Sequence, residues 1–108
     1  MIKSEALKGY NDIMILYILN GGDSYGYEIS KRIREISNNK YVIKETTLYS
    51  AFNRLEKNGY IGKYHGTQTF GKQRIYYKIT PSGNDYYLNR CNEWKETVLI
   101  VNNFIEEV

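Results

Sequence analysis

The clearest helical pattern in this sequence is Glu45-Thr-Thr-Leu-Tyr-Ser-Ala-Phe-Asn-Arg-Leu-Glu-Lys-Asn-Gly-Tyr-Ile61. At about 100° of rotation per residue, its apolar side chains fall on one stripe of a helix and its small polar side chains fall on the opposite stripe. The apolar stripe consists of Leu48, Ala51, Phe52 and Leu55, and the polar stripe consists of Thr46, Ser50, Asn53 and Lys57, flanked by Tyr49 and Arg54. The pattern predicts a helix over about 46–58, with one face for a core and the other for a partner.

The ends of this helix are also marked in the sequence. We expect Thr46 to cap its start, because a threonine hydroxyl can accept a hydrogen bond from an unpaired backbone N–H. Asn58-Gly59 is suited to the left-handed conformation that closes a helix. The polar face fits the reading of base edges and phosphates in a DNA major groove, but an ordinary solvated face fits this helix alone equally well.

Two further helices are predicted before this stretch. Apolar residues recur at helical spacing over 4–20 and end at Gly21-Gly22, a clear stop. Asp23-Ser24 can cap a second helix that continues to about Ser37, and a short β-prone run, residues 41–43, leads into the third helix. Three helices with a short connection between the last two are typical of a helix-turn-helix, in which the last helix enters the groove.

After Gly59 the pattern changes to the alternation of a β-hairpin. We expect one strand to start at Ile61 and a second to cover 73–80, with a basic, glycine-containing tip between them. A basic hairpin after a recognition helix is the wing of a winged helix, which would place Lys72 and Arg74 along phosphates or in the minor groove. The alternative is a hairpin that only stabilises the fold.

The segment 81–108 predicts one long helix. Thr80 is a favoured N-cap and Pro81, the only proline, suits the first helical position. Its heptad-like apolar stripe is too extensive for one small domain to bury, so we expect a homodimer rather than packing within one subunit. The expected dimer interface comprises Leu7, Met14, Tyr87, Cys91, Trp94, Val98, Val101 and Ile105.

Composition and charge narrow the classes of protein. The chain has 108 residues, a net charge of +3 and a single cysteine, so an intrachain disulfide is excluded and a reducing, cytoplasmic location is expected. Residues 54–78 carry six basic side chains against Glu56, a net +5, whereas residues 81–108 carry a net −3. Basic charge gathered on one segment indicates a polyanionic partner.

Several functions lack any signal in the sequence. No apolar run could span a membrane, and no cluster of residues has the spacing of a metal site, a phosphate-binding loop or a catalytic nucleophile with its base. His65, the only histidine, falls in an expected strand. We therefore expect neither an enzyme nor a bound cofactor or metal.

The order of motifs resembles the PadR family of bacterial transcriptional regulators. The matching runs are Tyr25-Gly-Tyr-Glu-Ile29, Thr47-Leu-Tyr49, Phe52-Asn-Arg-Leu-Glu56 with Gly59, Gly71-Lys-Gln-Arg74, and Tyr76-Tyr-Lys-Ile-Thr80 with Gly83. A single helix after the wing is similar to the compact branch of that family. The resemblance implies a homodimer that binds operator DNA and represses transcription.

The resemblance also implies a ligand hypothesis. Some members of the compact branch are relieved by flat aromatic drugs that stack between paired tryptophans at the dimer interface, and Trp94 occupies the corresponding place here. A pore for cations would favour an acid one turn beyond the tryptophan, where this chain has Val98. The alternative is an interface tryptophan with no ligand, in a DNA binder that has no small-molecule inducer.

The sequence as a whole predicts a mainly α protein with a small β-hairpin. Residues 1–80 would form a winged helix-turn-helix, with its wing at about 61–80, and residues 81–108 a dimerisation helix. Two copies would read a palindromic site on double-stranded DNA, using Thr46, Thr47, Tyr49, Ser50, Asn53, Arg54, Lys57, Lys72 and Arg74. The rival hypothesis is a protein–protein adaptor, since winged helices also serve as docking modules.

Overall fold

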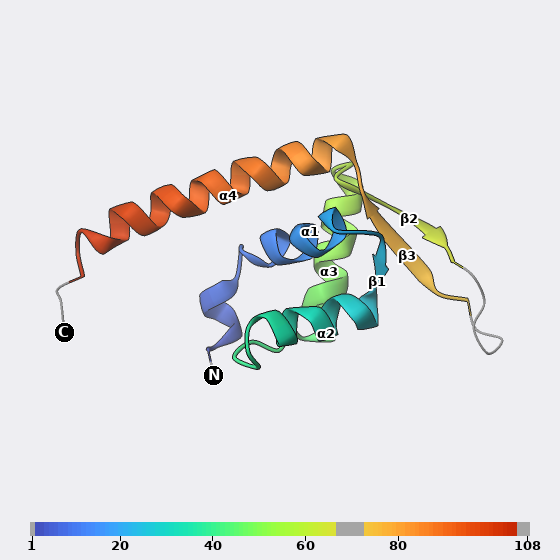
Figure 1. Cartoon of the computed structure of the whole chain (residues 1–108), viewed down its shortest axis with the longest axis horizontal. Coiled ribbons are helices and arrows are strands. Elements are labelled where there is room, and N and C mark those ends of the chain that lie inside the picture. The colour runs from blue at the N-terminus through green and yellow to red at the C-terminus, as the bar shows by residue number, and fades with distance from the viewer. Residues whose placement is uncertain (1, 67–72, 106–108) are drawn as a thin grey trace.

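The computed structural model describes residues 2–66 and 73–105 (Figure 1). The chain first forms a 3₁₀ helix and then alternates between helices and short strands. The elements in order are the 3₁₀ helix Ser4–Leu7, α1 Asn11–Asn20, β1 Ser24–Tyr25, α2 Gly26–Ile36, α3 Glu45–Lys57, β2 Ile61–His65, β3 Ile75–Ile79 and α4 Pro81–Asn102. The prediction of a mainly α protein with a winged helix-turn-helix and a long last helix is confirmed.

The core lies where α1, α2 and α3 meet the sheet. Ile15 and Leu16 of α1, Ile29 of α2 and Phe52 of α3 are buried there almost completely. The ring of Phe52 stacks on Tyr77 of β3 with ring centroids 4.0 Å apart, which joins the helices to the strands. The predicted apolar stripe of α3 is therefore its core-facing side.

The sheet is antiparallel, with strand order β1-β3-β2. Its register pairs Ile61 with Ile79 and His65 with Ile75, so the predicted hairpin is present as β2 and β3. The short strand β1 was not predicted. Ser24 pairs with Tyr77 in this sheet, and α2 starts later, at Gly26. The prediction that Asp23-Ser24 caps α2 is wrong, because the backbone of Ser24 belongs to the sheet.

The first predicted helix is divided into two pieces. Residues 4–20 form a 3₁₀ helix and α1 rather than one helix, because Gly9 adopts a φ of +93° between them. A left-handed backbone cannot continue a right-handed helix, and glycine adopts it without steric cost. The predicted stop at Gly21 is confirmed, since Gly21 is the C-cap of α1.

The start of α3 also differs from the prediction. The N-cap is Lys44, whose side chain makes no capping hydrogen bond, and Thr46 lies within the first turn. The predicted end is confirmed, with Asn58 as C-cap and Gly59 at a φ of +77°. Before α3, the run 41–43 is not a strand, but Tyr41 is buried and its hydroxyl donates to Asn11 at 2.6 Å.

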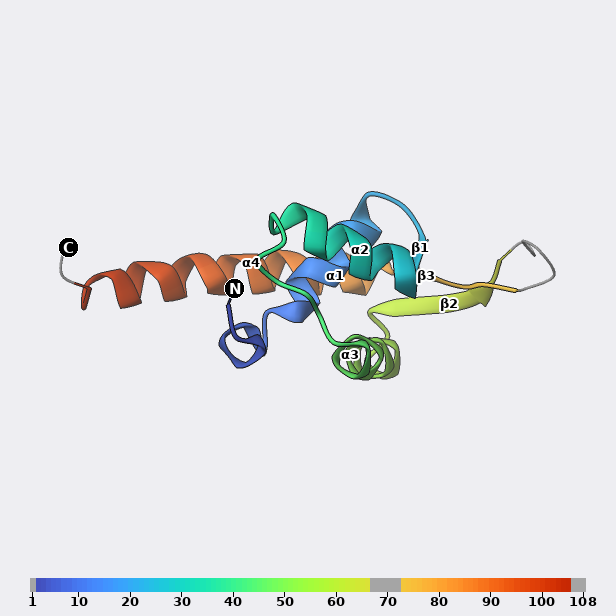
Figure 2. The same cartoon turned by 90° about the horizontal axis from the view of Figure 1, so that it is seen from below.

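The last helix, α4, begins as predicted and ends earlier. The hydroxyl of Thr80 accepts a hydrogen bond from the Gly83 N–H at 3.0 Å, with Pro81 at the first position. The helix ends at Asn102, the first of two consecutive asparagines of modest helix propensity, and not at Val108. Its first half packs on α1, whereas its second half extends past the other helices, at the opposite end of the molecule from the strand pair β2–β3 (Figures 1 and 2).

Candidate nucleic-acid interface

The recognition face of α3 is open to solvent. Leu48 and Phe52 point into the core, and most side chains on the opposite side of the helix are exposed. Of the residues predicted to bind DNA, the exposed ones on α3 are Thr46, Tyr49, Ser50, Asn53, Arg54 and Lys57, and Thr47 is half-buried. The structure therefore presents small hydrogen-bonding side chains along one edge of a helix, as groove reading requires.

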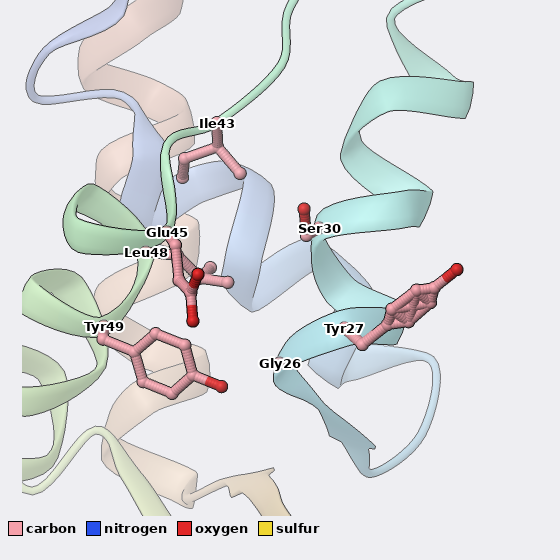
Figure 3. A pocket seen from close by; sticks show the side chains of 7 residues that line it. All are labelled: Gly26, Tyr27, Ser30, Ile43, Glu45, Leu48 and Tyr49. Carbon is pink, nitrogen blue, oxygen red and sulfur yellow. The ribbon is translucent and has the colours of Figure 1, made fainter.

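Tyr49 is held in a defined position at the junction of α3 with α2. Its hydroxyl points at Gly26, the first residue of α2 (Figure 3), and a Cβ atom at Gly26 would lie only 2.4 Å from that oxygen. The ring of Phe52 meets the Tyr49 ring edge-on at a centroid distance of 5.3 Å. The aromatic ring of Tyr49 can approach α2 this closely because residue 26 has no side chain.

A cavity of about 280 Å³ lies beside this contact, between α2 and the start of α3. The oxygens of Ser30 and Glu45 face it, while Tyr27 points outward to solvent (Figure 3). A second hollow of about 490 Å³ continues toward the sheet and shares Gly26, Tyr27 and Tyr49 with the first. Residues of α3 and of β3 therefore line adjoining hollows.

Arg74, the basic wing residue predicted to bind phosphate, lines the second hollow. Its guanidinium lies 4.4 Å from the ring centroid of Tyr25, a cation–π contact that keeps the charge close to the sheet. Tyr76 meets the same Tyr25 ring edge-on at 5.5 Å. The other predicted wing cation, Lys72, lies outside the described residues.

Tyr25, Gly26 and Tyr27 line the second hollow and were not among the residues predicted to bind DNA. In the sequence they carried the family resemblance, because a Tyr-Gly-Tyr run has no chemistry of its own. The available signal was the glycine between two aromatic residues, which permits a close approach of another chain segment. That the approaching group is Tyr49 depends on the packing of α2 against α3.

Arg54 has a partner that was not predicted. It donates hydrogen bonds of 2.7 and 2.8 Å to the carboxylate of Asp12 in α1, and this pairing raises the pKa of the guanidinium. The carboxylate also accepts a bond of 2.7 Å from the hydroxyl of Tyr86 in α4. The Arg54 side chain is still 52% exposed, so its predicted contact with DNA stays a prediction, while the Asp12 pair gives it a second role within the protein.

The basic charge near α3 is partly neutralised by neighbouring acids. Lys63 of β2 lies 3.4 Å from Glu56 at the edge of α3. Tyr64 of β2 donates to Asp23 at 2.7 Å, and this hydrogen bond raises the pKa of Tyr64. Lys57 of α3 and Arg74 before β3 are exposed cations that take part in neither the Lys63–Glu56 nor the Tyr64–Asp23 contact.

The tryptophan region lies on α4, away from the recognition face. Trp94 meets Tyr10 edge-on at a centroid distance of 4.8 Å and remains 44% exposed. Both rings border an apolar hollow of about 180 Å³ that is also lined by Leu7, Ile13 and Met14.

The residues predicted to form the dimer interface differ in how far they are exposed and in whether they belong to α4. Tyr87 is half-buried against its own chain, and Leu7, Met14, Cys91 and Val98 are also half-buried. Val101 is exposed near the end of α4, and Ile105 lies beyond the end of the helix, so the predicted helical stripe stops at Val101. The most exposed large apolar side chains here are Leu99 and Phe104, at 68% and 83%.

Two further observations concern the described residues 2–66 and 73–105 only. None of their helices is long and apolar enough to cross a lipid bilayer. No group of three or more histidine, cysteine or acidic side chains among them could hold a metal ion.

A helix-turn-helix followed by a paired-strand wing and a long last helix defines the winged helix-turn-helix class. Residues 15–89 match the model of the transcriptional regulator PadR-like family. The chain belongs to this family and is a transcriptional regulator of the PadR type. The family expectation drawn from the motifs around Tyr25, Phe52 and Arg74 is thereby confirmed.

Individual relatives agree with this assignment. A transcriptional regulator from Clostridium thermocellum is 56% identical with a TM-score of 0.89, over 94% of this chain and 99% of that chain. A PadR family transcription regulator from Clostridium difficile is 37% identical with a TM-score of 0.77, over 90% and 99%. Protein X of Lysinibacillus sphaericus, which is uncharacterized, is 42% identical over 98% of this chain and 97% of its own length.

A more distant structure shares the fold. PadR of Bacillus subtilis in complex with operator DNA has a TM-score of 0.68 and 22% identity, over 76% of this chain and 45% of that chain.

Proposed function

We propose that this regulator is a homodimeric repressor that binds a palindromic operator. In this proposal α3 enters the major groove, the wing residues Lys72 and Arg74 contact adjacent phosphates, and α4 joins the two copies. The observation that carries the proposal is the edge of α3 where the side chains of Ser50, Asn53 and Lys57 are exposed. The complex of Bacillus subtilis PadR with operator DNA supports the same use of the shared fold.

The proposed dimer follows from the second half of α4. Leu99 and Ile100 of α4, and Phe104 just beyond its end, are at least 60% exposed, and exposed apolar area of this kind is typical of an interface. We propose that α4 of a second copy covers them, with the residues predicted from the sequence as the rest of the interface. Dimerisation would place the two α3 helices in successive major grooves, about 34–36 Å apart.

The experiment that tests DNA binding is an affinity measurement over a range of salt concentrations. Wild-type protein should select palindromic duplexes from a random pool, and its affinity should fall steeply with salt because bound cations displace condensed counterions. Sedimentation should give a species of twice the 12.7 kDa chain mass. Binding to protein partners with little salt dependence, and to no duplex, would favour the adaptor function instead.

A second proposal concerns regulation by a small molecule. We propose that a planar aromatic compound enters between the two copies of Trp94 and Val98 and weakens operator binding. The observation that favours it is the exposed Trp94 ring beside an apolar hollow of about 180 Å³, since an aromatic face offers stacking. Planar dyes should quench the Trp94 fluorescence and release the selected duplex. A duplex that stays bound at saturating dye would contradict this proposal alone.

A further inference from the structure

Asp12 links the recognition helix to α4. Among the described residues it is the only charged side chain that is buried, at 4% exposure. Its carboxylate accepts two hydrogen bonds from Arg54 of α3 and one of 2.7 Å from the Tyr86 hydroxyl of α4. One acid on α1 is therefore bonded to both elements that the proposed function uses.

The chemistry of a buried carboxylate makes this link specific. An ionised acid removed from water is unfavourable unless its oxygens are hydrogen-bonded. Arg54 satisfies both oxygens with a planar fork, which fixes orientation as well as distance. Tyr86 adds the third bond, from α4, so rotation of α4 relative to α3 would break a hydrogen bond to a buried charge.

A second set of contacts joins the same two helices at their ends. The ring of Tyr86 stacks on Tyr60, just after α3, with centroids 4.1 Å apart and planes at 10°. The hydroxyls of Thr80 and Ser82 donate to the Gly59 carbonyl at 2.6 and 2.9 Å. A Cβ atom at Gly83 would lie 2.0 Å from the backbone carbonyl oxygen of Tyr60. The first turn of α4 is therefore in direct contact with the chain that follows α3.

We propose that Asp12 and Tyr86 are positioning residues for DNA recognition. Their hydrogen bond holds α4 at one angle to α3 and thereby sets the separation of the two recognition helices in the dimer. This inference rests on the proposed dimer through α4.

The length of α4 makes the angle at its start important. A helix of 22 residues is about 33 Å long, so a rotation of about 10° at one end moves the other end by about 6 Å. One base-pair step is about 3.4 Å, so the displaced helices would no longer match their two half-sites.

The test measures the separation of the two α3 helices directly. Spin labels are attached through Ser50→Cys, on the exposed face, in a Cys91→Ala background, and pulsed dipolar spectroscopy gives the distance distribution between the copies. Tyr86→Phe keeps the ring that stacks on Tyr60 and removes only the donor. Tyr64→Phe is the matched control, because it removes a tyrosine–aspartate bond of the same 2.7 Å length in the wing.

We expect Tyr86→Phe and Asp12→Asn to broaden or shift the distribution by several ångström, and Tyr64→Phe to leave it unchanged. Tyr86→Phe should also weaken binding to the selected palindrome about tenfold and leave binding to a duplex with a single half-site unchanged, a split that a general loss of stability would not produce. An unchanged distribution in both variants would overturn the inference and leave the proposed function standing. If the labelled parent protein shows no dipolar coupling between two labels, both the dimer and the inference are overturned.

Discussion

The guanidinium of Arg54 and the carboxylate of Asp12 form a two-bond ion pair, at 2.7 and 2.8 Å, although 42 positions separate them in the sequence. This pair gives a residue of the recognition helix a structural role. It also distinguishes Arg54, which is bonded to the protein, from Ser50 and Asn53 on the same helix, whose side chains are exposed.

Arg54→Ala should destabilise the folded protein by about 2 kcal/mol, because it leaves a buried carboxylate with one of its three hydrogen bonds. The half-exposed guanidinium lets water replace part of the loss, which keeps the value below that of a fully buried pair. Urea unfolding measures the change, with Lys57→Ala as the control on the same helix. Equal losses in the two variants would show that the ion pair does not stabilise the fold.

Gly83→Ala should destabilise the protein by about 2–3 kcal/mol, since the new methyl group would overlap the Tyr60 carbonyl oxygen at 2.0 Å and neither backbone segment can move freely. Gly62→Ala is the matched control, because its Cβ atom would meet only Lys78, at an ordinary 3.5 Å. Thermal unfolding of both variants is the measurement. A Gly83→Ala protein as stable as the control would mean that the backbones of Gly83 and Tyr60 leave room for a methyl group.

Gly26→Ala should change DNA binding more than stability. The added methyl group meets the hydroxyl of Tyr49 at 2.4 Å, and this exposed end of a side chain can move aside for less than about 1 kcal/mol. Displaced Tyr49 would then weaken operator binding. In a Tyr49→Ala background the same substitution should have no further effect on affinity, whereas equal effects in both backgrounds would exclude Tyr49 as the cause.

Asn53→Ala and Arg74→Ala should affect DNA binding in different ways. Asn53, on the exposed face of α3, is suited to base edges, so its loss should change the sequences selected from a random pool. Arg74, on the wing, is suited to phosphate, so its loss should weaken binding to all duplexes and reduce the salt slope by about 1. Identical losses on selected and random DNA for both variants would contradict this division of roles.

Tyr86 should make stability depend on pH in alkaline solution. Burial and the hydrogen bond to Asp12 raise the pKa of Tyr86 to about 12, from the ordinary value of about 10. Between these values the folded state keeps a proton that the unfolded chain has lost, so the contribution of Tyr86 is complete below about pH 10 and is lost as the pH rises through about 12. The difference in unfolding free energy between wild type and Tyr86→Phe should shrink over this range. A constant difference would mean that the tyrosine is not held by Asp12.

Local pattern was sufficient for most elements. The apolar stripe at Leu48 and Phe52 identified α3 and its buried face, because helical periodicity is visible within a few turns of sequence. Thr80-Pro81 located the start of α4 to the residue, because capping involves only neighbouring positions. Local pattern failed at Ser24, whose backbone pairs with Tyr77 instead of capping α2, because strand pairing depends on residues far away in the sequence.

The order of elements, the polar edge of α3 and the family could be predicted from the sequence, since these depend on residues close together in the chain. Which polar side chains contact other parts of the protein became visible only once the helices were packed together. Arg54 is bonded to Asp12, Tyr49 rests on Gly26, and Arg74 lies over Tyr25. The physical reason is that such partners are far apart in sequence and meet only when the helices pack, so no local spacing could reveal them.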